Sequence, residues 1–123
     1  MIDHLTIGVS DISRSCAFYD RLLAPLGITQ SLRFHDRVEV AAYGDDRPWL
    51  WLVAEDATRG KLHLALAAPD RAAVKAFDAA GLAAGGIDNG PPGLRPHYDP
   101  GYYAAFILDP DGHNIEAVCR RPD

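Results

Sequence analysis

The sequence predicts an α+β fold made of two similar halves, each with the element order βαβββ. Two observations carry this prediction: a repeat offset by 59 residues, the spacing between His4 and His63, and a single helical pattern flanked by strand patterns in each half. The 123 residues are enough for one domain, with a first module over about residues 1–58 and a second over about residues 59–123.

The repeat is visible as identical residues at one constant offset. Chance could supply one match, whereas several at the same offset indicate a duplicated module. The identical pairs include His4 and His63, Asp11 and Asp70, Ala17 and Ala76, Phe18 and Phe77, and Gly27 and Gly86.

The first half opens with a strand and a helix. Leu5, Ile7 and Val9 alternate with other residues, which is the period of a half-buried strand. Asp11 is suited to cap a helix N-terminus and Gly27 to end the helix. Apolar residues at spacings of three and four give this helix one buried face, made of Ile12, Cys16, Tyr19, Leu23 and Leu26. Three further strands are expected over residues 29–35, 38–43 and 49–53, with a turn at 44–48.

The second half repeats this order with a weaker helical pattern. Alternating leucines at 62, 64 and 66 predict its first strand. An alanine-rich helix is expected from Arg71 to Ala80, capped by Asp70 and ended by Gly81.

The rest of the second half contains a long segment rich in proline. Strands are expected over residues 102–108 and 113–118 around the turn at 109–112, with a short strand near residues 83–87. Residues 88–101 hold four prolines and three glycines. Such a segment is either a functional lid or a plain crossover between strands.

Composition and charge exclude several classes of function. The net charge is -5 and no patch is rich in Lys or Arg, which argues against a nucleic-acid partner. No apolar run approaches the ~20 residues that cross a bilayer, so no membrane span is predicted. The N-terminus lacks the pattern of a signal peptide, and a cytoplasmic location is expected. Cys16 and Cys119 are expected to be buried hydrophobic side chains.

Strand parity brings three side chains of metal-binding type to one face. His4 and His63 point away from the leucines beside them, and on the last strand Glu116 lies on the face opposite Ile115. If the leucines pack beneath the helices, the two imidazoles and the carboxylate share one concave surface. Three protein ligands leave positions open for water or substrate, as a catalytic metal requires. His4, His63 and Glu116 are therefore the candidate metal ligands, and Glu116 is also a candidate catalytic residue.

Each of these residues also has a purely structural interpretation. A single strand histidine is more often hydrogen-bonded or surface-exposed than a ligand, and Glu116 could face solvent from an edge strand. The equivalent repeat positions of His4 and His63 favour the metal site. His35 at a strand end and His113 after a turn lack that support, and both are expected to be exposed.

The repeat also predicts where a fourth protein ligand would lie. Aligning the last hairpins of the two halves at an offset of 63 or 64 places Val53 or Leu52 opposite Glu116. Neither side chain can bind a metal, so only three protein ligands are expected.

Substrate contacts are expected from the proline-rich segment and the strand after it. Arg95 could bind a carboxylate or phosphonate through two hydrogen bonds, with Tyr98 beside it, while His97 or Tyr103 could move a proton. The alternative is that Arg95 is a solvated loop charge. The alternative for Tyr102 and Tyr103 is that one side chain packs in the core and the other faces solvent. For Tyr102 we favour this structural interpretation over a role in the site.

Two tryptophans in the first half are candidates for an apolar wall. Trp49 and Trp51 are expected to share a strand face, where Trp51 could contact substrate. Packing in the core or in a dimer interface is the alternative.

Together these features resemble the vicinal oxygen chelate superfamily, which includes glyoxalase I, bleomycin-resistance proteins, fosfomycin-modifying enzymes and extradiol dioxygenases. The resemblance implies paired βαβββ modules whose curved mixed sheets form a cup around a metal. It matches His4, His63 and Glu116 to the family's first histidine, second histidine and terminal glutamate. The segments that carry it are residues 2–4, 9–11, 18–19 and 26–27, the His63 strand, and the closing Asp-Pro-Asp-Gly-His-Asn-Ile-Glu at 109–116.

The resemblance implies an enzyme that depends on a divalent metal ion and acts on a small oxygen-chelating substrate. Its type would be lyase, transferase or dioxygenase, and Fe, Mn, Zn or Ni would fit the ligand set. Glyoxalase I typically uses four protein ligands, so the three-ligand pattern is closer to fosfomycin-type transferases and extradiol dioxygenases. Small members are usually homodimers, some with each cup built from two chains, so that His4 would face the partner's His63.

A second function of another class stays open. Bleomycin-resistance relatives sequester a drug without turning it over, and the acidic net charge would favour a cationic ligand. The retained ligand triad favours the enzyme instead, because a protein that only sequesters has no chemical need for it.

Overall fold

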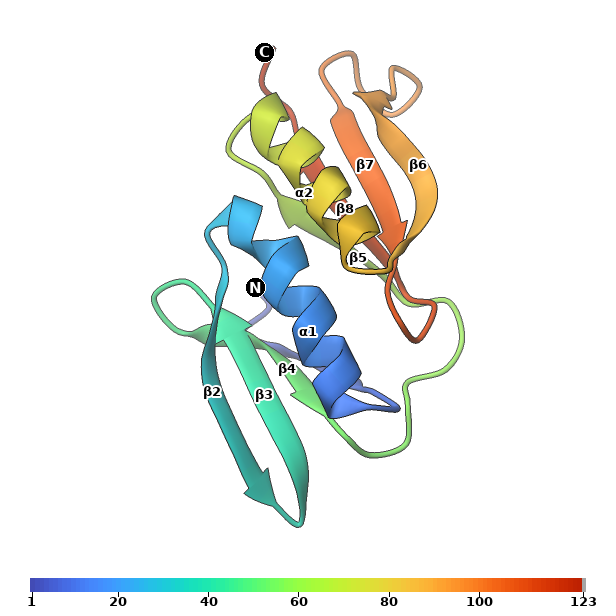
Figure 1. Cartoon of the computed structure of the whole chain (residues 1–123). Coiled ribbons are helices and arrows are strands. Elements are labelled where there is room, and N and C mark those ends of the chain that lie inside the picture. The colour runs from blue at the N-terminus through green and yellow to red at the C-terminus, as the bar shows by residue number, and fades with distance from the viewer. Residues whose placement is uncertain (123) are drawn as a thin grey trace.

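A computed structural model describes residues 1–122 and shows eleven helices and strands in chain order (Figure 1). The elements are β1 (Leu5–Gly8), α1 (Ile12–Leu23), the 3-10 helix η1 (Ala24–Leu26), β2 (Thr29–Asp36), β3 (Val38–Gly44), β4 (Pro48–Val53), β5 (His63–Ala67), α2 (Arg71–Ala83), β6 (Ile87–Leu94), β7 (Tyr103–Leu108) and β8 (Asn114–Cys119). No helix in this part of the chain is both long enough and apolar enough to cross a membrane.

Each half forms its own four-stranded mixed sheet. The strand orders are β1-β4-β3-β2 and β5-β8-β7-β6. In both sheets the first strand runs parallel to the last strand of its module, and the other neighbours are antiparallel. The predicted α+β fold of two βαβββ modules is therefore confirmed.

The two helices begin in the same way, as the repeat predicts. The side chain of Asp11 accepts a hydrogen bond from the backbone N–H of Arg14 at 3.0 Å, and Asp70 accepts one from Ala73 at 2.8 Å. Each carboxylate thus satisfies a backbone donor that the first turn of a helix leaves free. Gly27 follows η1 with a φ of 76°, a left-handed conformation that favours glycine.

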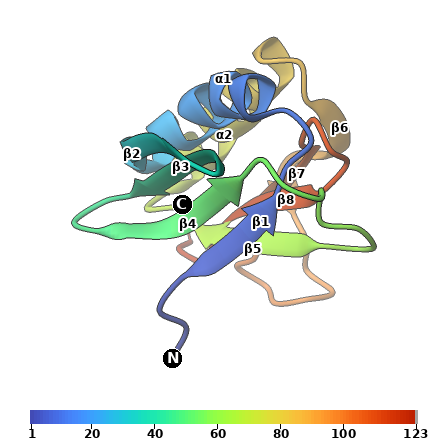
Figure 2. The same ribbon diagram turned by 90° about the horizontal axis from the view of Figure 1, so that it is seen from below.

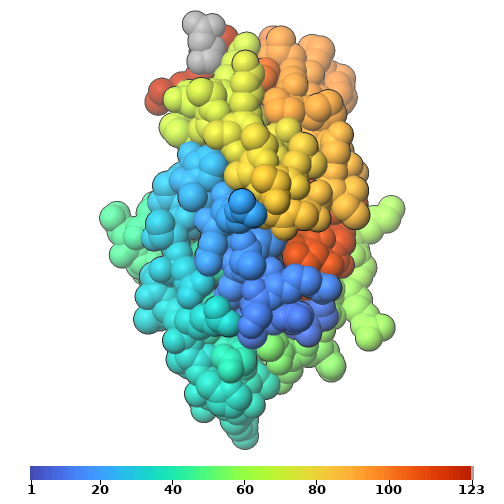
Figure 3. All heavy atoms as spheres, viewed as in Figure 1, coloured from blue at the N-terminus to red at the C-terminus, as the bar shows by residue number. Residues whose placement is uncertain are grey.

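The helices pack together on one side of the molecule and share one hydrophobic core with both sheets. Figure 2 shows α1 and α2 on the same side, and Figure 3 shows their atoms meeting across the front of the molecule. Phe18 and Phe77, which the repeat aligns, are both buried in this core. The modules therefore form one body through their helices, while the opposite faces of the sheets stay uncovered by helix.

Gly81 does not end the second helix as predicted. The helix continues to Ala83, with Gly81 inside it and buried. A Cβ atom at this position would lie 2.8 Å from Leu22 Cδ1 and 3.2 Å from Ile107 Cγ1. The glycine thus serves close packing between α2, α1 and β7 rather than helix termination.

The first half of the proline-rich segment is a strand, which the sequence did not predict. The short strand expected at 83–87 is largely the turn that joins α2 to β6, and β6 itself covers the first half of the expected loop. β6 is an edge strand and its pairing with β7 is interrupted by register shifts, so prolines within it need not donate to a neighbour. The remaining crossover is residues 95–102.

The prediction for His113 was wrong, and the one for His35 was confirmed. The side chain of His35 is 64% exposed, whereas the residue His113 is only 2% exposed. His113 precedes β8 with the parity of Ile115 and Ala117, which face the core, so its imidazole is drawn inward with them.

Candidate functional site

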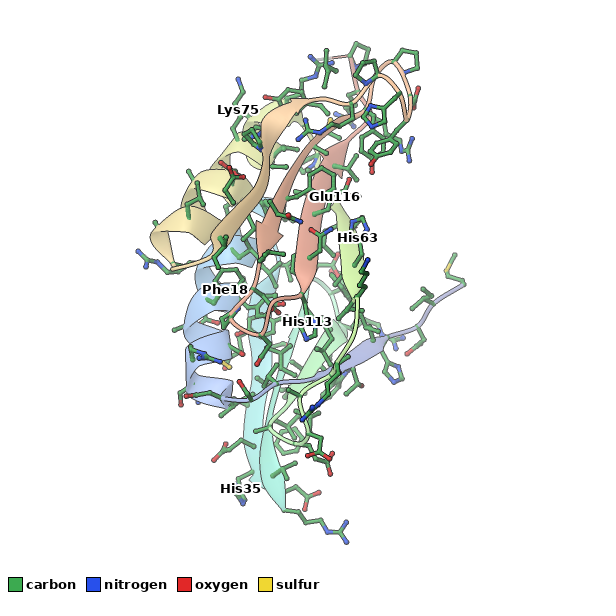
Figure 4. The ribbon with its side chains drawn as sticks, turned by 90° about the vertical axis from the view of Figure 1, so that its right-hand side faces the viewer. Phe18, His35, His63, Lys75, His113 and Glu116 are labelled. Atoms are coloured by element: carbon green, nitrogen blue, oxygen red, sulfur yellow. The ribbon has the colours of Figure 1, made fainter. Side chains whose placement is uncertain are left out.

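The second sheet brings two predicted metal ligands into direct contact. His63 Nε2 lies 2.8 Å from Glu116 Oε1, with the histidine on β5 and the glutamate on the neighbouring β8 (Figure 4). The side chain of Glu116 is 2% exposed, while that of His63 is 49% exposed. The pair therefore has one buried partner that is held in place and one partner open to a ligand.

Tyr102 completes the surroundings of the glutamate. Its hydroxyl donates to Glu116 Oε2, so both carboxylate oxygens have a partner. Burial, followed by this hydrogen bond, raises the pKa of Tyr102 to about 12, which keeps the hydroxyl protonated as a donor at neutral pH. From the sequence, we had favoured a structural interpretation of Tyr102 over a role in the site. The parity it shares with Phe106, which pairs directly with Glu116, is the signal that would have found it.

The two ligands fit one small cation. An imidazole nitrogen and a carboxylate oxygen are ligand types shared by Zn, Mn and Fe, and at 2.8 Å their atoms can approach the same ion. A buried carboxylate without partners would be costly, so the hydrogen bonds from His63 and Tyr102 stabilise Glu116 when no cation does. The donor set and its arrangement are therefore consistent with a divalent metal.

His4 lies elsewhere in the chain's own fold. Its side chain is 56% exposed, and Nδ1 lies 2.7 Å from Asp3 Oδ1, while Asp3 also pairs with Arg47 at 2.9 Å. These residues line a hollow of about 310 Å³ in the first module together with Trp51. Within residues 1–122, no three His, Cys, Asp or Glu side chains lie together as a metal-binding group. A single chain thus unites two of the three predicted ligands.

The strand register corrects the expected counterpart of Glu116. Thr6 pairs with Trp51 as Ala65 pairs with Glu116, and the repeat offset relates Thr6 to Ala65. The counterpart is therefore Trp51, not Val53 or Leu52, because the turn before the last strand differs in length between the modules. Trp51 is also unable to bind a metal, so the expectation of no fourth ligand is unchanged.

The predicted substrate residues of the crossover gather beside His63. A hollow of about 390 Å³ is lined by His63, Asn89, Gly90, Arg95, His97, Tyr98, Phe106 and Asn114. The rings of His97 and Tyr98 are 4.2 Å apart, and Tyr98 packs edge-on against Tyr102 at 5.1 Å. The crossover is therefore joined by aromatic contacts to the tyrosine that holds Glu116.

Tyr103 lies on the other side of the sheet from this hollow. It is buried in the core cluster, and the guanidinium of Arg71 on α2 lies 5.0 Å above its ring. The two tryptophans of β4 line different hollows, each of which His4 also lines, and Trp49 in addition packs against the core. The structure therefore brings neither Tyr103 nor Trp49 to the ligand pair.

Comparison with known proteins gives a consistent family assignment. The model of the Glyoxalase/Bleomycin resistance protein/Dioxygenase superfamily matches residues 1–117. A glyoxalase/bleomycin resistance protein from Albidiferax ferrireducens T118 is 32% identical, with a TM-score of 0.76 over 96% of this chain and 97% of that one. No curated protein matches the sequence significantly.

More distant structures share the fold alone. A glyoxylase/bleomycin resistance protein/dioxygenase domain from Frankia sp. EAN1pec is 17% identical, with a TM-score of 0.75 over 98% of both chains. Glyoxalase I from Zea mays is 22% identical, with a TM-score of 0.71, and 96% of this chain covers 45% of it. The fold thus corresponds to nearly the whole chain of the Albidiferax and Frankia proteins and to about half of the glyoxalase I chain from Zea mays.

Proposed function

Because the chain belongs to the glyoxalase/bleomycin resistance protein/dioxygenase superfamily, we propose that it is a divalent-metal-dependent enzyme acting on a small substrate that offers adjacent oxygens. The observation that carries the proposal is the contact of His63 Nε2 with Glu116 Oε1 at 2.8 Å on the open face of the second sheet. Members of this superfamily commonly use divalent metal ions.

We assign His63 and Glu116 of one chain and His4 of a second copy as the metal ligands. His4 is exposed and lines a different hollow from His63, so a second chain is the simplest source of a third donor. The sheet face that carries Trp51 also presents Leu32 and Phe34, which are 45% and 43% exposed. Such an apolar face is suited to cover the ligand pair of a second copy in a homodimer.

The metal would be held mainly by nitrogen and carboxylate oxygen. Two histidines and one carboxylate with open positions suit Fe(II) or Mn(II), and Zn(II) or Ni(II) also accept these ligands. A bound ion would act as a Lewis acid toward the oxygens it holds.

The chain's own residues have separate tasks in this proposal. Tyr102 fixes the second oxygen of Glu116, which keeps the first oxygen directed at the ligand site. Arg95 and Tyr98 bind the substrate from the crossover, and His97, at the rim of the same hollow, moves a proton. In the proposed homodimer, Trp51 of the second copy forms an apolar wall opposite them and excludes water.

Metal content after reconstitution tests the ligand assignment. We expect about one metal ion per chain in the wild type after chelator treatment and dialysis against Mn(II), Fe(II), Zn(II) or Ni(II), and a loss of at least about tenfold in affinity for Glu116→Gln. Glu39→Gln is the matched control, because Glu39 also contacts a histidine, His35, at 3.1 Å but far from the site. Unchanged affinity in Glu116→Gln would contradict the assignment.

Mixing two variants that each lack one proposed metal ligand tests whether the site is shared between two chains. His4→Ala and Glu116→Ala chains each lack one ligand, but a mixed dimer would contain one complete site. We expect metal binding to return on mixing to a fraction of the wild-type value. Loss of metal binding in both variants without recovery on mixing would contradict a site shared between two chains.

The second candidate is a protein that binds a drug-like molecule without turnover. The exposed apolar face around Phe34 and Leu32 favours it, because such a face can hold an aromatic ligand. Two results together would support binding over catalysis. The wild type would bind no metal at micromolar concentration but would bind a hydrophobic dye, and Phe34→Ser would lose the dye binding.

A further inference from the structure

We propose that Arg95 makes the hollow beside His63 a binding site for a small planar carboxylic acid. That this acid is the substrate rests on the proposed function. Its binding to the hollow does not depend on a metal and can be measured separately. It is carried by the fixed position of the guanidinium, by the absence of an internal partner for its charge, and by the chemistry of the hollow.

The guanidinium of Arg95 is held by the chain's own backbone and by an aromatic ring. Nη2 donates to the carbonyl of Pro91 at 2.7 Å, and Nη1 lies 3.5 Å from the carbonyl of Leu94. Its central carbon lies 5.4 Å from the centroid of the Phe106 ring. An arginine fixed in this way has already lost much of its side-chain freedom, and the N–H groups it does not use remain free to donate.

Two glycines of β6 make room for this arrangement. A Cβ atom on Gly90 would lie 3.2 Å from Arg95 Nη2 and 2.8 Å from Phe106 Cδ1, and one on Gly93 would lie 3.1 Å from Arg95 Nη1. Gly90 also has a φ of +150°, a backbone conformation that residues other than glycine rarely adopt. The two glycines thus leave the space that the guanidinium occupies between the strand backbone and the Phe106 ring.

The positive charge of Arg95 has no carboxylate partner among residues 1–122. Other arginines of the same chain do form such pairs: Arg14 with Asp111 at 3.7 Å, Arg47 with Asp3 at 2.9 Å and Arg120 with Asp99 at 3.1 Å. No Asp or Glu is among the residues that line the hollow, although the chain as a whole carries a net charge of -5. A partly buried cation without an internal counter-ion is suited to an anionic ligand.

The shape of the hollow selects the kind of anion. A guanidinium offers parallel N–H groups that match the two oxygens of a carboxylate. Aromatic rings form the walls: His97, Tyr98 and Phe106 line the hollow, and the ring of His63 lies 6.0 Å from that of Phe106. A flat acid can stack on these rings, with its carboxylate on Arg95 and its neighbouring oxygen toward His63.

The test is a titration of the metal-free protein followed by two-dimensional NMR of the arginine Nε–H groups. The probes are the planar acids salicylate and pyruvate and the non-planar acid lactate, each beside its uncharged amide. We expect a saturable shift of the Arg95 signal with the acids, tightest for salicylate, and affinities about tenfold weaker or worse for the amides. No saturable shift with any of the three acids, or equal binding of acids and amides, would overturn the proposal.

Variants connect the binding to the geometry. Arg95→Met is expected to abolish the binding, and Arg95→Lys to weaken it by about tenfold because an ammonium lacks the planar fork. Arg120→Met is the matched control, since Arg120 also lies over an aromatic ring, that of Tyr102 at 4.9 Å, but outside the hollow. Weakening by Arg120→Met equal to that by Arg95→Met would show a general charge effect and contradict the site.

The outcome is separable from that of the proposed function. Acid binding in metal-free protein, together with failure to bind any metal, would support the anion site and refute the metal-dependent enzyme. Metal binding that depends on Glu116, without acid binding, would leave the metal site in place and refute the substrate class.

Discussion

Trp51 occupies in the first module the position that Glu116 occupies in the second. Each lies beside the first strand of its module, Trp51 paired with Thr6 and Glu116 with Ala65. The duplicated fold therefore presents a carboxylate on one open sheet face and a large aromatic ring on the other. The two faces are complementary in the proposed dimer, with the ligands on one and an apolar wall on the other.

Replacing Trp51 is expected to weaken self-association without unfolding the chain. Trp51 lines an open hollow, so Trp51→Ala should raise the dissociation constant of the homodimer about tenfold or more in sedimentation experiments. Trp49→Ala is the contrasting variant, because Trp49 packs against the core and its loss should lower the free energy of unfolding instead. Equal self-association in Trp51→Ala and wild type would argue against a dimer that uses this face.

Removing the Tyr102 hydroxyl should destabilise the fold and weaken metal binding together. Tyr102→Phe leaves one oxygen of the buried Glu116 without its donor, which costs about 1–3 kcal/mol of unfolding free energy in urea titrations. Tyr98→Phe removes a hydroxyl from a residue that is 61% exposed and should change stability by less than about 0.5 kcal/mol. Similar values for the two variants would mean that the hydrogen bond to Glu116 contributes little.

Gly81→Ala should destabilise the protein although alanine is the better helix former. Propensity alone would favour the variant by about 1 kcal/mol, but the added methyl group would meet Leu22 and Ile107, and overpacking of this kind costs about 1–3 kcal/mol. The loss should shrink in the background of Leu22→Ala, which vacates that space. Strict additivity of the two changes in a double-mutant cycle would contradict the packing explanation.

His113→Leu is expected to raise the free energy of unfolding by about 1 kcal/mol. Within residues 1–122 neither ring nitrogen of His113 has a hydrogen-bond partner, and a buried donor without one carries a desolvation cost that an apolar side chain lacks. His35→Leu changes an exposed side chain and should have little effect. A fall of more than 1 kcal/mol in His113→Leu, measured by chemical denaturation, would show that the imidazole is needed in the core.

Stability should fall as the pH rises above about 10, where tyrosine ordinarily titrates. Burial raises the pKa of Tyr43 and raises that of Tyr19 well above its usual value, with hydrogen bonds to carboxylates adding to the effect. The unfolded chain then releases protons that the folded chain keeps, so the stability is fully present below the unfolded pKa and is lost at higher pH. Denaturation between pH 9 and pH 11 should show this slope, and Tyr43→Phe should flatten it. An equal slope in the variant would exclude Tyr43 as a source.

Local sequence determined the modules and most of their elements. Alternating apolar residues, the capping residues Asp11 and Asp70, and the constant repeat offset act over a few residues each, so the order βαβββ was predictable without the rest of the chain. Parity likewise predicted that His63 and Glu116 share a face, because the side-chain alternation of a strand is fixed by its backbone.

Tertiary structure decided the features that depend on contacts between distant elements. Gly81 stays within a helix because α1 and β7 approach it, and Tyr102 reaches Glu116 because β7 and β8 pair in one register. His4 has the right parity and the right repeat position, yet its distance from Glu116 depends on how the modules pack through their helices, which no pattern within either module encodes. The sequence by itself thus determined which residues face the open side of each sheet, and only the packing of the modules decided which of them meet within one chain.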